Sequence, residues 1–225
     1  MKKLTLGIIP DGNRRYAKKH GKDALWGHEE GFKNFKKIIT YCVNIEAIEH
    51  LAIYAFSTEN WKREKKELDH LLGLFEKMFI YTKDTLSKEG VKIKIIGDFG
   101  KLTKGLVETA NKIEQLTKSN KKLTLWTAIS YGGRAEIADA ARRAIKQNAQ
   151  INKENDFKKF LWSAEMPDID IMIRTGGEKR LSNFFPWHLS YAELFFVDKY
   201  WPEFNTKDLD RILEEYSKRE RRMGK

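Results

Sequence analysis

Short apolar runs alternate with longer amphipathic stretches along the whole chain. The runs are rich in β-branched and aromatic residues, as in buried strands, and the stretches between them repeat apolar residues at helical spacing. The predicted strands are residues 4–9, 51–56, 91–96, 123–129, 169–173 and 194–197. The predicted helices are residues 28–49, 65–88, 103–118, 133–149 and 206–222.

This alternation predicts an α/β fold. Parallel neighbours in a sheet need a crossover connection, and a helix between successive strands supplies it. No internal repeat, low-complexity tract or linker divides the chain. We therefore expect a single domain over residues 1–225, with a central, mostly parallel sheet of about six strands flanked by helices.

Composition narrows the class of partner. The 225 residues include 43 Lys and Arg against 32 Asp and Glu, so the formal charge of +11 favours nucleic acid, lipid headgroups or small phosphates. A hydrophobic content of 41% is enough for a core and argues against a disordered chain. The lone Cys42 excludes an internal disulfide, and the apolar start is too short for a signal peptide or a membrane span. We expect a cytoplasmic protein.

The loops that follow the predicted strands are the places to look for chemistry, because ligands of parallel sheets bind outside the carboxyl ends of the strands. Four such loops are rich in glycine, arginine and small polar residues: 10–15, 57–63, 130–134 and 174–183. The P-loop and the dinucleotide pattern Gly-x-Gly-x-x-Gly are both absent. The five histidines show no zinc spacing, and no Ser/His/Asp or Cys/His arrangement indicates a nucleophile.

The first of these loops offers an anion site. It combines the carboxylate of Asp11, a glycine that frees backbone N–H groups, and the guanidinium groups of Arg14 and Arg15. If a helix begins there, its N-terminal amides add to the site, and a diphosphate is the obvious occupant. An ordinary turn with solvated arginines explains this loop equally well.

The segment 174–183 is a stronger candidate. Arg174 and Arg180, a double glycine and the pair Ser182-Asn183 place several donors at one strand end, as the binding of several phosphate oxygens requires. A flexible basic loop is the alternative.

Phosphates held by arginines leave room for a magnesium ion bound by one or two carboxylates. Asp11 and Glu193 are the candidate ligands, each at the edge of a predicted strand. Taken alone, Glu193 is equally a charged strand-edge residue. His28 follows Gly27 at a predicted helix start, where a cap explains it as well as a phosphate ligand does.

Two predicted helices carry more apolar surface than one core-facing stripe needs. Residues 68–81 place their leucine, phenylalanine and methionine side chains over a wide arc, and Phe32, Phe35 and Val43 belong to a similar stripe. Two well-buried helices account for this pattern alone. Beside a diphosphate site, however, a second apolar face indicates a cleft for a long hydrocarbon.

Several blocks of sequence, in order along nearly the whole chain, match those of one protein family. They are Asp11-Gly12-Asn13-x-Arg15, Gly27-His28 with Gly31, Tyr54-Ala55-Phe56-Ser57-Thr58-Glu59-Asn60-Trp61, Tyr131-Gly132-Gly133-Arg134, Ile173-Arg174-Thr175-Gly176-Gly177-Glu178, Arg180-Leu181-Ser182-Asn183 and Tyr191-x-Glu193-Leu194. Together they resemble the cis-prenyltransferases, and among these the bacterial undecaprenyl diphosphate synthases most of all.

The resemblance implies an enzyme with a hydrophobic product tunnel. Such an enzyme adds isopentenyl diphosphate repeatedly, with cis double bonds, to an allylic primer, usually farnesyl diphosphate, and uses Mg²⁺ as cofactor. The implied product is undecaprenyl diphosphate, the precursor of the lipid carrier for cell-wall peptidoglycan. A shorter-chain synthase of the same family is the alternative.

The resemblance also implies roles for individual residues. Asp11 would bind magnesium and help the allylic diphosphate to leave, Asn60 would take part in proton removal, and Glu193 would be the magnesium ligand beside isopentenyl diphosphate. The implied substrate-binding residues are Gly12, Asn13, Arg14, Arg15, Tyr16, His28, Ser57, Thr58, Glu59, Trp61, Arg63, Arg174, Arg180, Leu181, Ser182, Arg222 and Gly224.

The implied partners follow from the same likeness. The ending Arg222-Met223-Gly224 resembles one that reaches into the site of a partner subunit, which implies a homodimer. The lipid product implies transient contact with the inner face of the membrane, and nucleic acid is not expected as a partner.

The chain departs from the family pattern at five positions. Arg14 stands where glycine is common, Tyr16 where tryptophan is, Ala24 where an arginine is frequent, Glu64 where a proline is usual, and Lys179 where some members have histidine. Arg14 could replace the guanidinium missing at Ala24, and a charged Lys179 cannot bind magnesium.

Two other functions stay open from the sequence. One is a catalytically silent subunit of the same fold, although such subunits usually lack the loop aspartate and phosphate arginines that this chain keeps. The other is an RNA-binding protein, which only the positive charge suggests.

Overall fold

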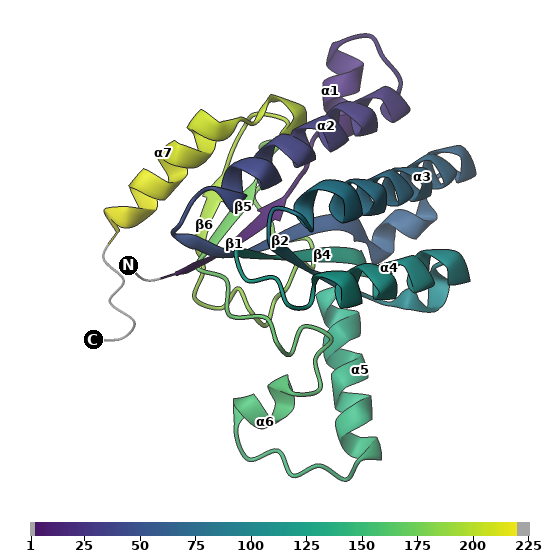
Figure 1. Cartoon of the computed structure of the whole chain (residues 1–225), viewed down its shortest axis with the longest axis vertical. Coiled ribbons are helices and arrows are strands. Elements are labelled where there is room, and N and C mark those ends of the chain that lie inside the picture. Colours follow the sequence, from purple (N-terminus) through teal and green to yellow (C-terminus); the bar gives the residue numbers. More distant parts are fainter. Residues whose placement is uncertain (1–2, 220–225) are drawn as a thin grey trace.

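Six parallel strands form the centre of the computed structural model, which describes residues 3–219 (Figure 1). They are β1 (Leu4–Ile9), β2 (Ile48–Ser57), β3 (Val91–Ile96), β4 (Leu123–Tyr131), β5 (Ile171–Arg174) and β6 (Glu193–Phe196). Their order across the sheet is β3-β4-β2-β1-β5-β6, and every neighbouring pair is parallel. The carboxyl ends of all six strands therefore share one edge, and the predicted fold class is confirmed.

Helices connect the strands. They are α1 (Asn13–Lys19), α2 (Ala24–Val43), α3 (Lys65–Tyr81), α4 (Lys104–Thr117), α5 (Gly133–Lys146), α6 (Glu154–Lys158) and α7 (Thr206–Ser217). Short 3₁₀ helices span Thr58–Lys62, Phe99–Lys101 and Trp201–Glu203, and a π-helical turn, Thr82–Leu86, follows α3. Among residues 3–219, no helix is long and apolar enough to cross a membrane.

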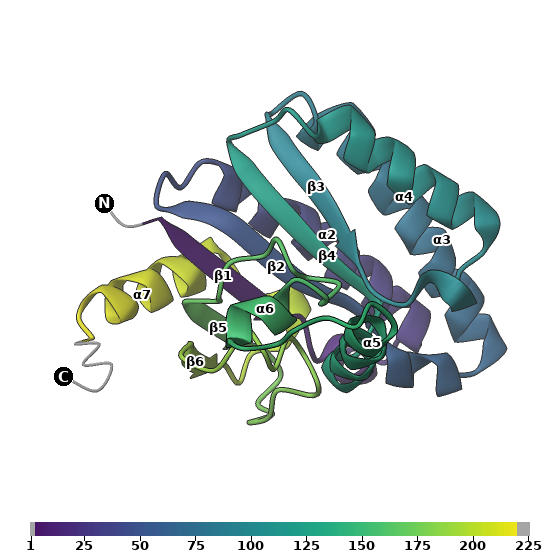
Figure 2. The ribbon, with the colours of Figure 1, turned by 90° about the horizontal axis from the view of Figure 1, so that it is seen from below.

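The sheet is buried on both faces because successive side chains of a strand point to opposite sides. One face packs against the apolar sides of α2, α3, α4 and α7. The other face is covered by the chain between α6 and β6, through buried residues such as Met166, Phe184 and Phe185. Figure 2 shows the two layers on opposite sides of the strands.

Most differences from the sequence prediction lie at element ends. The predicted helix 28–49 begins earlier, at Ala24, and ends at Val43, because Ile48 pairs with Leu4 and so belongs to β2. The predicted helix 65–88 ends as an α-helix at Tyr81 and widens into the π-helical turn. Helices α1 and α6 were not among the predicted elements; α1 buries only Ala17, which is too little for a periodic apolar pattern. Helix α1 begins within the loop 10–15, where the sequence allowed for a helix start.

Two glycines let α1 lie directly on α2. A Cβ atom at Gly27 would lie 2.2 Å from the carbonyl oxygen of Asn13, and one at Gly31 would lie 2.4 Å from Asn13 Oδ1. At Gly27 the contact is with backbone, so a larger residue would push α1 away; at Gly31 the contact is with the side chain of Asn13, which would have to move. The close approach holds the Asp11–Arg15 loop beside the start of α2.

We expect Gly27→Ala to lower the free energy of unfolding by about 1–3 kcal/mol, because the new methyl group pushes α1 from α2. Gly73 is the matched control: it lies inside α3, and a Cβ there meets nothing within 4 Å. Gly73→Ala should raise the free energy of unfolding by about 0.5–1 kcal/mol through helix propensity. Urea denaturation measures both; equal changes in the two variants would contradict the close-packing account.

Candidate active site

Two adjoining cavities open at the carboxyl edge of the sheet. The inner cavity, of about 550 Å³, extends between α2 and α3, and the outer one, of about 610 Å³, lies over α1. Asp11, Asn13, His28 and Arg63 line both cavities, so the two spaces meet at these side chains. The predicted strand-end loops 10–15, 57–63 and 174–183 all contribute to the walls.

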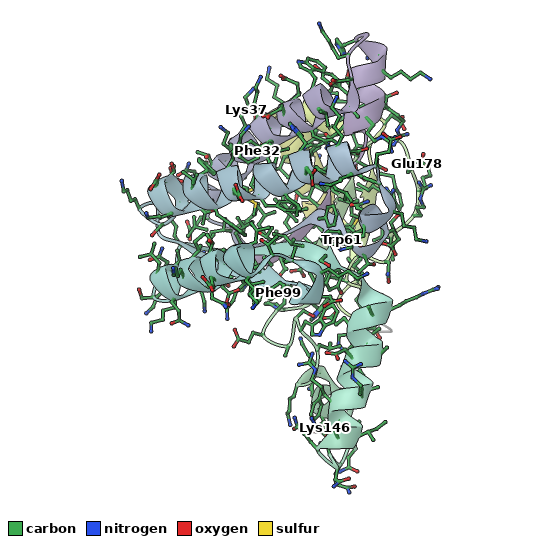
Figure 3. All side chains as sticks on the ribbon, turned by 90° about the vertical axis from the view of Figure 1, so that its right-hand side faces the viewer. Phe32, Lys37, Trp61, Phe99, Lys146 and Glu178 are labelled. Atoms are coloured by element: carbon green, nitrogen blue, oxygen red, sulfur yellow. The ribbon has the colours of Figure 1, made fainter. Side chains whose placement is uncertain are left out.

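The inner cavity is apolar away from its mouth. Its apolar walls are Ile9, Phe32, Phe35, Ile53, Tyr54, Ala55, Leu71, Leu74, Phe75, Met78 and Trp201. Figure 3, which labels Phe32, shows α2 and α3 side by side on this part of the molecule. The second apolar face predicted for the two helices is therefore present, and α3 turns Leu74 into the cavity, whereas the space beside Gly73 is open.

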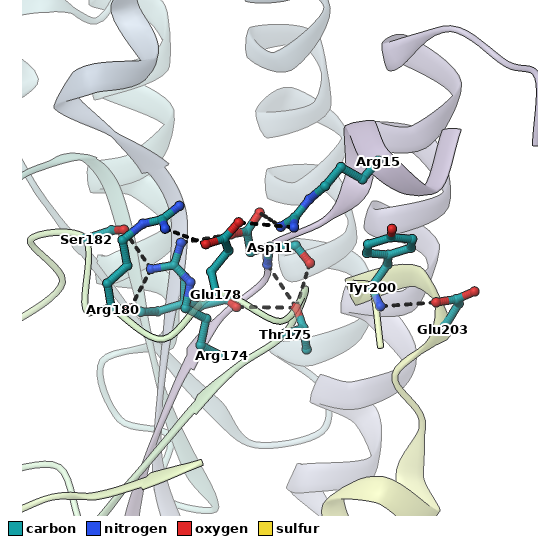
Figure 4. Close-up of polar contacts among 10 residues, drawn as sticks. Asp11, Arg15, Arg174, Thr175, Glu178, Arg180, Ser182, Tyr200 and Glu203 are labelled. Carbon is teal, nitrogen blue, oxygen red and sulfur yellow. Dashed lines mark hydrogen bonds and ion pairs between the residues drawn. The ribbon is translucent and has the colours of Figure 1, made fainter. Parts of the chain in front are cut away.

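Asp11 is the centre of the polar mouth (Figure 4). Its Oδ2 lies 2.8 Å from Arg174 Nη2, and its Oδ1 lies 3.2 Å from Arg15 Nη2. The backbone N–H of Asp11 donates to Thr175 Oγ1 at 2.9 Å, and the Thr175 hydroxyl donates to the carbonyl oxygen of Asp11 at 2.8 Å. The ends of β1 and β5 are thereby tied together.

Arg174 is almost fully buried, with 4% of its side chain exposed. Its Nη1 donates to Ser182 Oγ at 2.6 Å and to the carbonyl oxygen of Arg180. Within residues 3–219, Arg174 Nε and Asn13 Oδ1 are buried and have no hydrogen-bond partner. Because buried polar groups are almost always paired, two orphaned atoms in the wall of one cavity indicate a polar ligand there.

Glu178 joins the two predicted phosphate-binding loops. Its Oε1 lies 3.3 Å from Arg15 Nη1 and its Oε2 lies 2.5 Å from Arg180 Nη1. Figure 4 shows these residues in one row with Asp11 and Arg174. Glu178 was part of a motif but not of the predicted site.

Glu67 holds a second cluster of cations. Its Oε1 accepts hydrogen bonds from His28 Nε2 at 2.9 Å and from Arg63 Nη1 at 3.0 Å, and Arg14 Nε lies 4.0 Å away. Burial lowers the pKa of His28, although the hydrogen bond to Glu67 acts in the opposite direction, so the imidazole is neutral at pH 7. Burial acts to raise the pKa of Glu67, but the hydrogen bond from His28 and the charge of Arg63 hold it below its ordinary value.

Glu67 was not predicted, and Asn183 was named as a donor of the loop 174–183 but not among the implied substrate-binding residues; each left a signal in the sequence. Glu67 follows Arg63 by four residues at the start of α3, the spacing of a helical ion pair. Asn183 lines the inner cavity, accepts the backbone N–H groups of Gly133 and Arg134, and has a left-handed backbone with φ of 66°. Asparagine tolerates that conformation better than most residues.

The loop after β2 divides into cavity-lining and supporting residues. Ser57, Glu59 and Asn60 line the inner cavity, and Asn60 Oδ1 accepts the backbone N–H of Ser57 at 3.0 Å. Thr58 and Trp61 do not line it: the Thr58 hydroxyl contacts Glu59, and the Trp61 indole donates to Ser130 Oγ at 3.0 Å.

Two further predicted residues lie outside both cavities, and two lie outside the described residues. Tyr16 stacks on Trp26 with ring centroids 5.4 Å apart, and Leu181 packs into the core on the sheet face away from α2. Arg222 and Gly224 fall beyond residue 219. Gly12, Arg14 and Arg15 line the outer cavity, as does Ala24, so Arg14 brings a guanidinium to the same space.

The structure does not bring Glu193 to Asp11. Glu193 begins β6 and pairs in register with Ile171, three residues before Arg174, so it lies at the amino end of the sheet. Its Oε2 contacts Arg219 Nη1 at 2.6 Å. Within this chain the two candidate magnesium ligands therefore lie at opposite ends of the strands, because Glu193 begins its strand whereas Asp11 follows its own; Glu193 as a magnesium ligand stays a prediction.

A magnesium ion fits this site only if a bound substrate supplies some of the oxygen atoms that coordinate it. Residues 3–219 contain no group of three or more His, Cys, Asp or Glu side chains that could hold a metal. Asp11 offers one carboxylate in the mouth of the cavity, which suits Mg²⁺ because this ion commonly takes one or two carboxylates and completes its shell with substrate phosphates and water.

One Ser/His/Asp contact series exists that the sequence did not indicate. Ser163 Oγ lies 2.8 Å from His188 Nε2, and His188 Nδ1 lies 3.2 Å from Asp168 Oδ1. Ser163 and His188 are buried beneath the sheet face away from α2, and Ser163 also contacts Glu136 Oε1 at 2.6 Å. A serine with no exposed surface cannot attack a substrate, so this series stabilises the fold.

Comparison with known proteins gives consistent results. Residues 9–224 match the prenyltransferase family model described as "Putative undecaprenyl diphosphate synthase". The chain is 41% identical to an isoprenyl transferase of Fusobacterium nucleatum, over 97% of this chain and 94% of that protein. It is also 41% identical to the tritrans,polycis-undecaprenyl-diphosphate synthase (geranylgeranyl-diphosphate specific) of Pyrococcus abyssi, over 100% of this chain and 90% of that protein.

A solved structure has the same fold. The crystal structure of lavandulyl diphosphate synthase from Lavandula x intermedia in complex with dimethylallyl diphosphate superposes with a TM-score of 0.90 at 31% identity, over 98% of both chains.

The buried His188 predicts how stability depends on pH. Burial lowers the pKa of His188 from 6.5 to about 4, with Lys158 acting in the same direction and Asp168 against it. The unfolded chain therefore takes up this proton at higher pH than the folded protein does. The contribution of the neutral His188 to the free energy of unfolding is fully present above pH 6.5 and is lost as the pH falls toward 4.

Between pH 6.5 and about 4, we expect the free energy of unfolding to fall less for the His188→Gln variant than for the parent protein. Urea denaturation across a pH series measures the slopes, and His20→Gln, which changes an exposed histidine, is the control. Equal slopes for the parent and His188→Gln would contradict the prediction.

Proposed function

Because the chain belongs to the cis-prenyltransferase family, we propose that it condenses isopentenyl diphosphate repeatedly onto an allylic diphosphate primer. One observation carries this proposal: a mouth lined by arginines continues into an apolar cavity of about 550 Å³. A substrate needs both a diphosphate and a long hydrocarbon to use both parts.

The allylic diphosphate binds where the two cavities meet, beside Asp11, Arg15, His28 and Arg63. Breaking the allylic C–O bond leaves positive charge on carbon and negative charge on the departing diphosphate. Guanidinium groups already fixed around that diphosphate stabilise the charge as it develops, and this lowers the barrier.

Asp11 would hold the magnesium ion together with oxygens of the diphosphate. The ion supplies Lewis-acid stabilisation of the leaving group. The fit depends on Asp11 changing partners, since its carboxylate contacts Arg15 and Arg174.

Isopentenyl diphosphate binds beside Arg174, Arg180 and Ser182. Holding its double bond against the allylic carbon makes bond formation effectively unimolecular, which is itself a large contribution to rate. The new C–C bond uses the electron pair of that double bond, and the resulting cation loses a proton.

Asn60 orients water or substrate rather than acting as a base, because an amide has no useful basicity at neutral pH. Its Oδ1 is already engaged by the backbone N–H of Ser57. A diphosphate oxygen is the acceptor of the proton.

The finer assignments are also proposals. We take farnesyl diphosphate as the primer and undecaprenyl diphosphate, the precursor of the cell-wall lipid carrier, as the product. The Pyrococcus relative is named for geranylgeranyl diphosphate, so primers of different length belong in the test. A homodimer would let Glu193 reach an Asp11 site only from the partner copy, since the two lie at opposite ends of the sheet within one chain.

The deciding experiment incubates purified protein with labelled isopentenyl diphosphate, magnesium and geranyl, farnesyl or geranylgeranyl diphosphate, and sizes the products. The expected result is a ladder of elongated polyprenyl diphosphates with farnesyl diphosphate preferred. Absence of any elongated product with all three primers would refute the proposal.

Asp11→Asn should reduce turnover by about 100-fold or more at saturating magnesium, because several kcal/mol of charge stabilisation depend on this carboxylate. Its melting temperature should fall as well, because the substitution leaves the buried guanidinium of Arg174 without its counter-charge, so turnover is compared at a temperature where both proteins are folded. An unchanged turnover number would remove Asp11 from the mechanism.

Leu74→Trp should yield shorter products, because the larger side chain fills the cavity in which the hydrocarbon grows. Leu74 is buried in the cavity wall, whereas Gly73 faces open space, so Gly73→Trp is the control and should leave product length alone. Full-length products from Leu74→Trp with a lowered melting temperature would instead make Leu74 an ordinary core residue.

A further inference from the structure

The outer cavity carries more positive charge than its carboxylates neutralise. Six of its lining side chains are cationic, and only two, Asp11 and Glu178, are carboxylates. Arg15 and Arg180 form ion pairs with those carboxylates, and Arg63 forms one with Glu67. The unneutralised charge therefore belongs to the remaining three side chains: Arg14, Lys18 and Lys22.

Arg14 and Lys18 lie on α1, and Lys22 follows the turn after it; we call these three cations of the outer cavity the row. Arg14 and Lys18 are one helical turn apart. The chain then turns back at Gly21, whose φ is +66°, and backbone hydrogen bonds from Gly21 to Lys18 and from Lys22 to Ala17 fix the turn that places Lys22 on the same cavity. Lys19, the next residue on the helix, faces elsewhere and contacts Glu203 at 2.9 Å.

The row lacks internal partners. Arg14 is 62% exposed and makes one long contact, 4.0 Å to Glu67, and neither Lys18 nor Lys22 forms an ion pair with any residue from 3 to 219. An anion reaching these side chains displaces only water. By contrast, an anion that binds Arg15 or Arg174 must compete with Asp11.

We propose that Arg14, Lys18 and Lys22 form an outer anion site that takes inorganic diphosphate as it leaves the reaction centre. The proposal rests on the proposed function, in which each condensation releases one diphosphate beside Asp11. That diphosphate must leave before the lengthened chain can take its place. The inner cavity is apolar away from its mouth, whereas the outer cavity is lined by charged side chains, so we take the outer cavity as the way out for the anion.

The residue types suit a transient site. A lysine ammonium is strongly hydrated, flexible and binds phosphate as a point charge, whereas arginine forms a rigid two-pronged contact. A row of solvated cations attracts a multiply charged anion without holding it tightly, and its affinity falls as salt screens the charges.

The test is a calorimetric titration of inorganic diphosphate into protein already saturated with farnesyl diphosphate, without isopentenyl diphosphate, so that no turnover occurs. The parent protein should bind inorganic diphosphate in this state. The double variant Lys18→Gln/Lys22→Gln should bind it about five- to tenfold more weakly, as expected for two exposed charges.

The affinity for farnesyl diphosphate should change by less than about twofold in the same variant. Lys121→Gln is the matched control, because it removes one exposed lysine charge from the turn before β4, outside both cavities. It should leave both affinities unchanged.

Three results would overturn the outer site. One is a primer-saturated parent protein that does not bind inorganic diphosphate. Another is a double variant that binds inorganic diphosphate as tightly as the parent protein, which would place that binding at the isopentenyl diphosphate subsite instead. The third is a double variant that loses affinity for farnesyl diphosphate as strongly as for inorganic diphosphate, which would make these lysines part of the primer site. Failure of the proposed function is distinguishable, because it appears earlier, as absence of primer binding or of elongated product.

Discussion

The ion pair between Asp11 and Arg174 is the interaction on which the polar mouth depends. A guanidinium that is 4% exposed needs a counter-charge, since an unpaired buried cation costs several kcal/mol. Asp11 provides it from the neighbouring strand end, and Thr175 ties the same two strands through the backbone. With Arg174 fixed, its Nη1 donates to Ser182 Oγ and to the carbonyl oxygen of Arg180, so one ion pair organises two loops.

The same arrangement explains how charge and hydrocarbon space coexist in one pocket. Parallel strands bring all the polar loops to one edge, while the helices that cross over carry apolar side chains along the sheet. Gly27 and Gly31 then let α1 approach α2 closely enough for the arginine loop to meet the mouth of the apolar cavity. Backbone contact, rather than side-chain chemistry, sets that junction.

Carboxylates inside the site stabilise its cations. Asp11, Glu178 and Glu67 each contact two or more basic groups, and so they limit the repulsion among the arginines. They also make anion binding more demanding, because an anion must bind the basic groups more strongly than the carboxylate that it displaces. In the proposed function a diphosphate with magnesium would do so, whereas an anion at Arg14, Lys18 and Lys22 displaces no carboxylate in close contact.

Local pattern was enough to find the strands, their mostly parallel arrangement and the loops that carry Asp11 and Arg174, because apolar runs and turn residues act over a few neighbours. Family likeness added the nature of the substrate. Only the folded chain decided which side chains meet: Glu193 precedes its strand and so lies at the far edge, Glu67 joins His28 and Arg63 from three separate segments, and Leu74 rather than Gly73 faces the cavity. Those outcomes depend on strand register and helix rotation, which packing between distant segments sets and no local pattern encodes.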